Sequence, residues 1–403
     1  MKILVLNSGS SSQKSCVYEI GEALPDSPPS PIWEGKIEWD GGRAKLRVRA
    51  SAGHRQAEEV QSTDRAEAMR HLLRALTSGS ATILQDKSEI GVAGHRIVNG
   101  GAQYARPAAI TQGVKKAIEE MAEFAPLHNR AGLEGIRLIE ETFGSVPQVA
   151  VFDTAFHRGM PDAATVYPGP YEWVERGIRR YGFHGINHQY CAERAARLLE
   201  RELNSLRLVT CHLGNGCSLA AIRDGDSVDT TMGFTPLEGL MMGTRSGSVD
   251  PGILTYLMRE QKLTGEQLDE LLNKKSGLLG ISGLSSDMRQ IVEAMKQGNA
   301  RAKLAFDIFA HRVRAGIAAM VASLGGIEAL IFTAGIGENS PEVRSAVCAH
   351  LGFLGLALDT AKNQTSQDDG DISTRESKVR VLVLQAQEDW AIAKECWSLL
   401  RKV

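Results

Sequence analysis

The feature that most constrains the fold is an apolar segment that ends in a small, polar, glycine-containing turn, and it occurs three times. Residues 3–6 lead into residues 7–14, residues 206–211 into residues 212–218, and residues 330–332 into residues 335–340. Apolar runs of this kind are typical of strands that are buried on both faces, as in α/β folds. Backbone N–H groups in such turns bind anions, and glycine lets a phosphate approach the chain. The pattern therefore predicts an α/β protein with phosphate-binding turns at its strand ends.

The first two turns are each followed by a second strand-like segment, at residues 16–20 and 218–222, so the same unit occurs in both halves of the chain. This repetition predicts two similar lobes. Apolar residues at helical or alternating spacing indicate further helices and strands. Predicted helices cover about 64–77, 113–123, 131–142, 251–260, 265–273, 300–324, 341–350 and a C-terminal segment from 389; predicted strands cover 32–40, 44–50, 90–97, 149–152, 330–333 and 379–384.

Length and composition restrict the class of protein. A chain of 403 residues is long enough for two or three domains. It contains 41 glycines, whereas average usage of about 7% predicts roughly 28, which indicates many tight turns or close ligand contacts. A net charge of -2 argues against a nucleic-acid partner. Six cysteines without a C-x-x-C pair predict reduced thiols and a cytoplasmic protein.

One segment could be mistaken for a membrane-spanning helix. Residues 315–337 contain a single charge, Glu328. Their uninterrupted uncharged part is about 13 residues long, which is too short to cross a bilayer, and Gly325 and Gly326 then break the pattern. The segment therefore predicts a buried helix, a turn and a buried strand, and no membrane association is expected.

Several common catalytic motifs are absent from the sequence. It has no G-x-x-x-x-G-K-[ST], no G-x-G-x-x-G after a strand, no H-E-x-x-H and no G-x-S-x-G. His184 and His188 have the spacing of a zinc-binding helix, but Gly185 stands where the glutamate would be needed. Lys14 closes the first turn as a point charge suited to phosphate. An ordinary hairpin explains any one of the turns, whereas three together favour nucleotide binding in a cleft between two lobes.

Segments throughout the chain resemble the signatures of the acetate kinases. They are residues 6–12 followed by Lys14, residues 94–101, 125–129, 151–157, 180–185, 212–216, 241–247 and 333–339, and Glu388. They follow the order of the family and extend from residue 1 to about 390. The resemblance implies the acetate and sugar kinase, heat-shock chaperone and actin fold, an α/β architecture with two duplicated actin-like (ribonuclease H-like, βββαβαβα) lobes around a central cleft.

The same resemblance implies reversible, in-line phosphoryl transfer from ATP to acetate, giving acetyl phosphate and ADP. It also implies Mg²⁺, with Mn²⁺ as an alternative, and a homodimer. The expected N-terminal lobe covers residues 1–157 plus about 389–403, closed by the C-terminal helix. The expected C-terminal lobe covers about 158–388 and carries most of the nucleotide site.

Four residues match catalytic positions of the family: Arg96, Asp153, His184 and Arg245. Phosphoryl transfer to a carboxylate brings negative charges together, so the site must supply cations and positioning rather than a strong base. The two arginine forks suit the acetate carboxylate and the transferring phosphoryl group. The histidine would donate to an equatorial phosphoryl oxygen, and the aspartate would orient Arg96 or a metal-bound water.

The remaining matches concern metal, substrate and nucleotide. Asn7 and Glu388 resemble the magnesium-binding pair, although Glu388 would also suit a helix N-terminus without any metal. Val98, Leu127 and Pro236 match a small apolar pocket for the acetate methyl group, which Arg96 would complete. The residues expected at the nucleotide are Lys14, Ser10, Ser12, His212, Leu213, Gly214, Asn215, Gly216, Asp287, Met288, Arg289, Gly335, Ile336, Gly337, Glu338 and Asn339.

Two alternative functions stay open. Gln13 and Asn99 depart from the usual family pattern, and such departures bear on substrate size, so a kinase for propionate or another short-chain carboxylate is the nearest alternative. An actin-like or heat-shock-like ATPase, which would drive partner binding, is the remote one. The acid-binding arginines argue against it.

Overall fold

The computed structural model describes residues 1–8, 12–40, 43–51, 53–60, 64–101, 103–123, 126–366 and 368–401, with the side chains of residues 12, 40, 123 and 126–128 outside this description. The chain forms two compact units. Unit 1 comprises Met1–Ala155 and Gln387–Val403, and unit 2 comprises Phe156–Ala386. Each unit is built around one mixed β-sheet.

The sheet of unit 1 has the strand order β5-β4-β3-β2-β1-β6-β8-β7. Strand β1 pairs antiparallel with β2 and parallel with β6, which in turn pairs parallel with β8. The strands are β1 Lys2–Ser8, β2 Ser12–Glu19, β3 Trp33–Asp40, β4 Arg43–Ala50, β5 Arg55–Val60, β6 Ile90–Ile97, β7 Ala108–Ala109 and β8 Gln148–Phe152.

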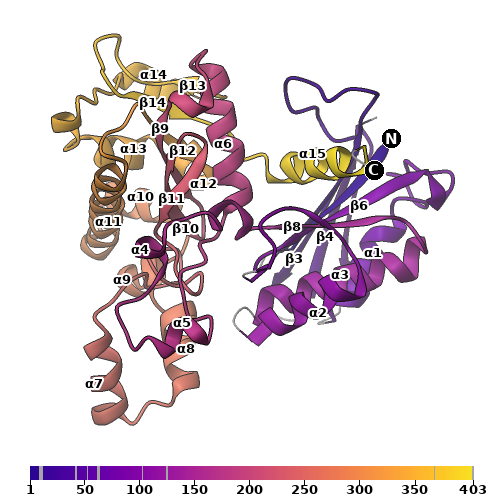
Figure 1. Cartoon of the computed structure of the whole chain (residues 1–403), viewed down its shortest axis with the longest axis horizontal. Coiled ribbons are helices and arrows are strands. Elements are labelled where there is room, and N and C mark those ends of the chain that lie inside the picture. The colour runs from indigo at the N-terminus through magenta and orange to yellow at the C-terminus, as the bar shows by residue number, and fades with distance from the viewer. Residues whose placement is uncertain are drawn as a thin grey trace. The chain divides into compact units, whose positions relative to one another are not determined.

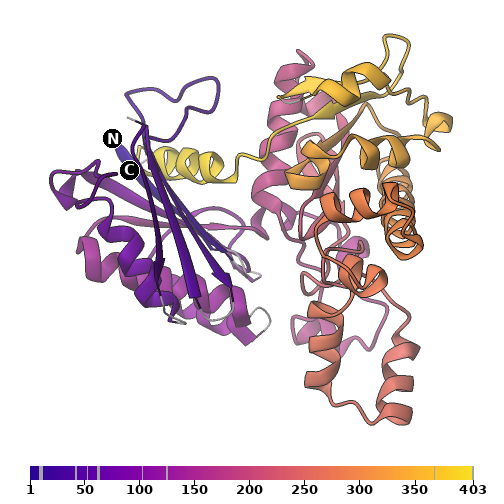
Figure 2. The ribbon, with the colours of Figure 1, turned by 180° about the vertical axis from the view of Figure 1, so that it is seen from behind.

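Helices cover both faces of this sheet. Figures 1 and 2 show α1 (Arg65–Arg74), α2 (Gln112–Glu120) and α3 (Pro126–Phe143) on one face and α15 (Glu388–Leu400) on the other. The central strand β1 is therefore enclosed, and Ile3, Leu4 and Val5 are fully buried. This explains why the first strand is an unbroken apolar run rather than an alternating one.

The sheet of unit 2 has the order β11-β10-β9-β12-β14-β13. Helix α6 packs on β9 and β12, and α11 packs on β10 and β9 from the opposite side (Figure 1). The strands are β9 Arg207–Leu213, β10 Cys217–Arg223, β11 Asp226–Thr230, β12 Ala329–Thr333, β13 Gly370–Asp371 and β14 Arg380–Val383. The helices are α4 Asp162–Thr165, α5 Glu172–Glu175, α6 Gly185–Leu198, α7 Pro251–Gln261, α8 Gly265–Lys274, α9 Gly277–Ser282, α10 Met288–Lys296, α11 Ala300–Leu324, α12 Ala334–Asn339, α13 Pro341–Cys348 and α14 Thr360–Thr365.

The two sheets share one topology. Strands β3-β2-β1-β6-β8 of unit 1 correspond to β11-β10-β9-β12-β14 of unit 2, with three antiparallel strands followed by two parallel ones. The final helix of each repeat is exchanged: α6 follows β8 in sequence but packs in unit 2, while α15 follows β14 but packs on β1 and β6 of unit 1. The predicted α/β fold with duplicated actin-like units is confirmed.

Parts of two predicted turns are regular structure, while residues 9–11 of the first turn lie outside the described part of the chain. Strand β1 continues through Ser8 and β2 begins at Ser12, so Asn7 and Lys14 are cross-strand partners rather than turn residues. Residues 335–339 belong to the short helix α12, which begins at Ala334. In both cases the polar, glycine-containing composition suggested a turn, but hydrogen bonding to the neighbouring strand or along the helix satisfies the backbone.

The segment with a single charge folds as predicted from its length. Helix α11 ends at Leu324, Gly325 takes a left-handed conformation with φ 69° and β12 follows. Among the described residues, none of the helices has the length and apolar character that crossing a membrane requires.

Strand β5 was not predicted, because its residues lie mostly exposed at the sheet edge and do not alternate.

Candidate active site

Three parallel strands of unit 1 end at the same edge of the sheet and place polar side chains there. Asn7 lies near the end of β1, Arg96 near the end of β6, and Asp153 directly after β8. Ligand sites of open α/β sheets form at the carboxyl ends of parallel strands. Glu388, the first residue of α15, reaches the same group. The structure therefore brings four residues predicted from the sequence into one cluster.

Arg96 lies at the centre of this unit 1 cluster. Its Nη2 donates to Asp153 Oδ2 at 2.5 Å, its Nη1 donates to Asn7 Oδ1 at 3.2 Å, and the same Nη1 lies 3.8 Å from Glu388 Oε2. Burial lowers the pKa of Arg96, but the Asp153 and Glu388 carboxylates outweigh it and raise that pKa above its ordinary value. The guanidinium is thus charged and held in one orientation by Asp153.

A second carboxylate of α15, Asp389, was missed by sequence reasoning. Asn7 Nδ2 donates to Glu388 Oε2 at 3.1 Å and to Asp389 Oδ1 at 2.9 Å. Lys14 Nζ lies 2.5 Å from Asp389 Oδ2, and the Cys16 thiol donates to the same oxygen at 3.6 Å. The signal available in the sequence was the acidic pair Glu388 and Asp389 at the start of the predicted C-terminal helix.

Lys14 was predicted to bind phosphate, and in the structure its ammonium is paired with Asp389. Burial lowers the pKa of Lys14, but the Asp389 carboxylate raises it by more, so the net shift is upward. Half of the Lys14 side chain is exposed, whereas the Asp389 side chain is only 6% exposed. The charge of Lys14 therefore serves at least to neutralise a buried carboxylate.

The donor set of the unit 1 cluster fits a magnesium ion. Asp153 Oδ1 is buried without a hydrogen-bond partner, and Glu388 supplies a second carboxylate. Mg²⁺ is usually bound by one or two carboxylates together with substrate phosphates and water, not by an all-protein cage. The described residues contain no group of three or more His, Cys, Asp or Glu side chains placed to hold a metal.

The turn after β6 carries Val98, the first predicted pocket residue. Asn129 fixes this turn, because its Oδ1 accepts from the Asn99 backbone N–H at 3.1 Å and its Nδ2 donates to the Asn99 carbonyl at 2.9 Å. Asn99 itself accepts from the Gly101 N–H at 2.8 Å. Val98 is buried. The predicted residue Ser10 and the side chains of Ser12 and Leu127 lie outside the described part of the chain.

In unit 2, the turn between β9 and β10 brings two predicted catalytic groups together. The turn is tight, with Gly214 N–H donating to the Gly216 carbonyl at 3.0 Å. A methyl group placed on Gly216 would lie 3.1 Å from Arg245 Nη2 and 3.4 Å from His184 Nε2. A guanidinium donor of Arg245 and a ring nitrogen of His184 therefore flank the bare backbone of Gly216.

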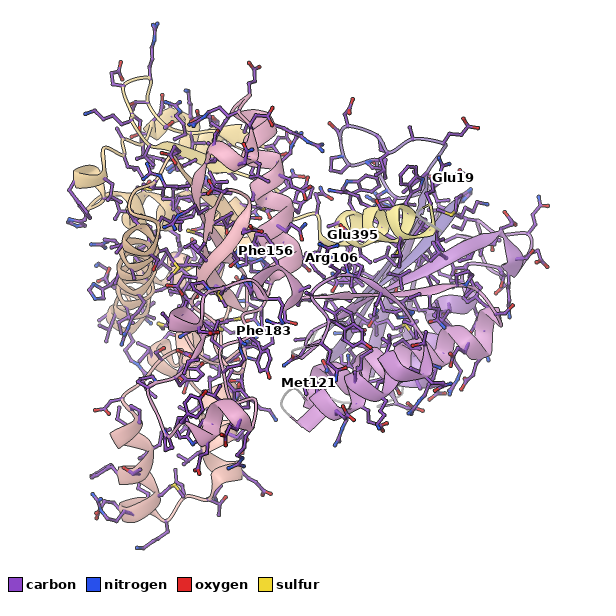
Figure 3. All side chains as sticks on the ribbon, in the orientation of Figure 1. Glu19, Arg106, Met121, Phe156, Phe183 and Glu395 are labelled. Carbon is purple, nitrogen blue, oxygen red and sulfur yellow. The ribbon has the colours of Figure 1, made fainter. Side chains whose placement is uncertain are left out.

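His184 has an unusual backbone conformation at the start of α6. Its φ of 58° and ψ of 22° lie in the left-handed region, which costs energy for a residue with a side chain and is concentrated at functional sites. Its ring stacks on His212 with the centroids 3.9 Å apart, and its Nδ1 lies 2.8 Å from Ser218 Oγ. The preceding residue Phe183, labelled in Figure 3, is buried and anchors the approach to the helix.

Arg245 carries a half-buried guanidinium without a carboxylate partner among the described residues. Its Nη1 donates to the Pro236 carbonyl at 2.7 Å, so a predicted pocket residue holds it through the backbone. Burial lowers the pKa of Arg245, which the neighbouring Cys217 only partly opposes. A half-buried cation of this kind loses part of its hydration and gains from an anion that approaches it. Arg245 is therefore prepared to bind a negatively charged group.

The three predicted nucleotide segments of unit 2 are neighbours. A methyl group on Gly243 would lie 2.1 Å from Asn215 Oδ1 and 3.1 Å from the Ser286 carbonyl, so the glycine allows residues 212–216 to approach the start of α10. A methyl group on Gly214 would lie 3.7 Å from Cβ of Ala334, at the start of α12. Asp287 caps α10 by accepting from Arg289 N–H at 2.9 Å.

Arg344, which sequence reasoning missed, fixes helix α12 by donating hydrogen bonds to its backbone carbonyls. Arg344 Nη1 donates to the carbonyls of Gly337 at 2.8 Å and Glu338 at 2.6 Å, and its Nε and Nη2 donate to Asn363 at 2.7 Å each. The side chain is 1% exposed. Its positive charge lies at the carboxyl end of α12, where it opposes the negative end of the helix dipole. No local sequence pattern identifies this contact.

Comparison with known proteins is consistent with the geometry. The model of the acetokinase family matches residues 2–394. A protein named acetate kinase from Cyanothece sp. is 57% identical over 403 residues, covering 100% of this chain and 99% of the relative. Another protein named acetate kinase, from Gloeobacter violaceus, is 58% identical over 406 residues and covers 100% of both chains.

Comparison with solved structures agrees with the comparison of sequences. The acetate kinase of Porphyromonas gingivalis is similar with a TM-score of 0.91, 39% sequence identity and coverage of 99% of both chains. A propionate kinase of Francisella tularensis is similar with a TM-score of 0.89, 36% identity and coverage of 98% of both chains. Sequence similarity over nearly the whole length thus accompanies the duplicated fold and the two clusters. The chain belongs to the acetokinase family.

Proposed function

We propose that this chain is an acetate kinase, which transfers the γ-phosphoryl group of ATP reversibly to acetate and forms acetyl phosphate and ADP. The observation that carries the proposal is the match to the acetokinase family over residues 2–394. The half-buried Arg245, which has no carboxylate partner among the described residues, supports it, because such a group is suited to the charge of a transferring phosphoryl group.

The chemistry needs no general base. Acetate is ionised at neutral pH, so its oxygen can attack the γ-phosphorus directly while the bond to the ADP oxygen breaks. In the proposed roles, Arg245 and His184 donate to the phosphoryl oxygens and Arg96 binds the acetate carboxylate. Asp153 positions Arg96 through the hydrogen bond of 2.5 Å. Holding the reactants in line and neutralising charge supply most of the catalysis in such transfers.

We assign the nucleotide to the neighbouring segments of unit 2, which are residues 212–216, 287–289 and 335–339. Their mutual approach at Gly243 and Gly214 supports this assignment. In unit 1, Lys14, Ser10 and Ser12 are proposed to contribute to phosphate binding. Units 1 and 2 are proposed to correspond to the two lobes that the family resemblance implies.

Magnesium, or manganese in its place, is proposed as the metal, held by Glu388 with Asn7. The buried oxygen of Asp153 that has no partner supports a cation near this carboxylate cluster. A bound divalent cation would neutralise charge on the nucleotide phosphates. The Asn7 oxygen already accepts a hydrogen bond from Arg96. The proposed contribution of Asn7 to the metal site is therefore to position the Glu388 carboxylate through the 3.1 Å hydrogen bond from its Nδ2.

A kinase for propionate is the second candidate, because the propionate kinase structure is nearly as similar as the acetate kinase structure. Val98, Leu127 and Pro236 are proposed to enclose the methyl group of the acid. One additional methylene changes discrimination by only about 1–3 kcal/mol, so kcat/KM must be compared directly across acetate, propionate and butyrate. The largest value identifies the substrate.

The decisive test of the activity is acetate-dependent formation of ADP in the presence of hydroxylamine, which traps acetyl phosphate as the hydroxamate. We expect ADP and hydroxamate in equal amounts, both dependent on acetate and on Mg²⁺. Slow ATP hydrolysis that is indifferent to every short-chain acid would reject the proposal and favour an actin-like ATPase.

Two further features are proposed at the level of the whole protein. A homodimer is supported by Ile253, Tyr256 and Met258 on α7, which are 47%, 52% and 47% exposed, since apolar side chains gathered on one element are typical of interfaces. Light scattering would test it. A cytoplasmic location is supported by the six cysteines, all of which are buried and none of which forms a disulfide, as expected in a reducing compartment.

A further inference from the structure

A continuous row of hydrogen bonds leads to His184 through the interior of unit 2. Thr210 Oγ1 lies 2.6 Å from His188 Nδ1, His188 Nε2 lies 2.8 Å from Ser218 Oγ, and Ser218 Oγ lies 2.8 Å from His184 Nδ1. Thr210 comes from β9, Ser218 from β10 and the two histidines from α6. Thr210, His188 and Ser218 are completely buried.

The hydroxyl of Ser218 lies between two imidazole nitrogens and has one proton to donate. It can donate to only one nitrogen and must accept from the other, so the tautomers of His184 and His188 are linked. Burial and the nearby His157 and His212 lower the pKa of His188 well below its ordinary value, which keeps that ring neutral with a single proton.

The donor and acceptor of each hydrogen bond in the row follow from the His184 nitrogen that must carry a proton in the proposed reaction. His184 Nε2 faces the same point beside Gly216 as Arg245 Nη2, so this nitrogen must carry a proton to donate to a phosphoryl oxygen. His184 Nδ1 then accepts from the Ser218 hydroxyl, Ser218 accepts from His188 Nε2–H, and His188 Nδ1 accepts from the Thr210 hydroxyl. Each buried group in this order has a partner of the required type.

We propose that Ser218 is a positioning residue, which, supported by His188 and Thr210, keeps the proton of His184 on Nε2 and fixes the direction of that ring. This inference rests on the proposed function for the role of the Nε2 proton. It also explains how His184 is held in the left-handed backbone conformation at the start of α6, since the bond from Nδ1 ties its side chain to β10. The spacing of His184 and His188, which suggested a zinc site, serves this row instead.

The test is Ser218→Ala, measured by kinetics and by nitrogen NMR. Protein labelled with ¹⁵N-histidine reports the tautomer of each ring, and loss of one signal set in His184→Gln assigns His184. In the wild type we expect the proton of His184 on Nε2. In Ser218→Ala we expect a mixture of tautomers and a kcat that is lower by about tenfold to hundredfold, the size of effect expected for a lost buried hydrogen bond. KM for ATP and for acetate should change less than about threefold.

Ser227→Ala is the matched control, because Ser227 is also buried and its Oγ lies 2.7 Å from Nδ1 of His157. It removes a bond of the same kind outside the row, and kcat should stay within about twofold. Thr210→Val removes the far end of the row and should lower kcat by a smaller factor. In the Ser218→Ala background, Thr210→Val should have no further effect on kcat, because the connection to His184 is already broken.

Several outcomes would overturn the inference: a wild-type His184 protonated on Nδ1, an unchanged tautomer in Ser218→Ala, or a kcat loss in Ser227→Ala as large as that in Ser218→Ala. Thermal unfolding of each variant separates these outcomes from loss of the fold. Failure of the proposed function would be distinct, since the wild type would then show no acetate-dependent turnover while the NMR signature of the row could still be present.

Discussion

Gly216 is required by close packing rather than by backbone freedom in this structure, because its neighbours leave little room for a side chain. A methyl group there would lie 3.1 Å from Arg245 Nη2 and 3.4 Å from His184 Nε2. In Gly216→Ala these two groups must therefore shift by a few tenths of an ångström. We expect kcat to fall by about tenfold to hundredfold, since small displacements of positioned groups are costly. The free energy of unfolding should change by less than about 1 kcal/mol.

Gly265→Ala is the control for this substitution, since a methyl group at Gly265 would meet nothing within 4 Å. Steady-state kinetics and urea denaturation of both variants provide the comparison. An unchanged kcat in Gly216→Ala, or a loss of stability without a loss of activity, would show that Gly216 has only a structural role.

Arg245 offers a second prediction at the residue scale. Arg245→Ala should lower kcat by about 10²–10³, the usual effect of losing one donor to a transition-state oxygen. ATP affinity should change far less, because the charge of Arg245 matters most when the phosphoryl group is in transit. Stability should not fall, since the substitution removes a half-buried cation that has no carboxylate partner among the described residues.

Arg245→Lys extends this test. It keeps the charge but loses the planar fork, so we expect only partial recovery of kcat relative to Arg245→Ala. Titration with a non-hydrolysable ATP analogue gives the affinity independently of turnover. A kcat equal to that of the wild type in Arg245→Ala would remove Arg245 from the catalytic machinery.

At the scale of single elements, α12 depends on a side chain from another helix. Arg344 donates to the carbonyls of Gly337 and Glu338 near the end of α12. Arg344→Met leaves these buried acceptors and Asn363 without their donor, and the free energy of unfolding of unit 2 should fall by about 2–4 kcal/mol. KM for ATP should also rise, because residues 335–339 are proposed to contact the nucleotide.

Lys296→Met provides a matched control for the loss of a cationic side chain in the same region. Lys296 forms an exposed ion pair of 2.8 Å with Glu342, and exposed pairs contribute only about 0–1 kcal/mol. Urea unfolding followed by fluorescence, together with ATP titrations, distinguishes the two variants. Equal stability losses in both would contradict the assigned role of Arg344.

At the scale of the whole molecule, each unit contains a buried neutral histidine that makes stability depend on pH. In unit 1, burial lowers the pKa of His95 to about 4, and the hydrogen bond to Gln148 opposes this only in part. In unit 2, burial lowers the pKa of His188. The unfolded chain binds these protons near pH 6.5 whereas the folded chain does not.

Stability from His95 is therefore fully present above about pH 6.5 and is lost progressively as the pH falls toward 4. The loss from this residue amounts to about 3 kcal/mol, and His188 adds to it. Urea denaturation at pH 7, 6 and 5 measures the free energy of unfolding. His95→Gln should flatten the pH dependence by the contribution of one proton. Identical pH dependence in His95→Gln and the wild type would show that His95 does not carry this effect.

The predicted and observed boundaries of an element agree where residues within that same segment determine the boundary. The single charge and the two glycines of residues 315–337 set the end of α11 and the start of β12. The two ends of the turn predicted for residues 7–14 are strand residues instead, because Asn7 pairs with Lys14 on the neighbouring strand, which composition does not reveal. Likewise Asp389 and Arg344 act through partners far along the chain, at Lys14 and Gly337.

The sequence by itself determined the α/β class and the duplication, because buried strands and the turns after them are encoded locally. Its resemblance to the acetate kinases pointed to the motif residues Arg96, Asp153, His184 and Arg245. Only the tertiary structure decided that α6 and α15 exchange between the units, that Asp389 joins the unit 1 cluster, and that Ser218 connects His184 to His188. The reason is physical: hydrogen bonds and ion pairs between distant segments depend on sheet order and helix packing, which no local spacing of residues specifies.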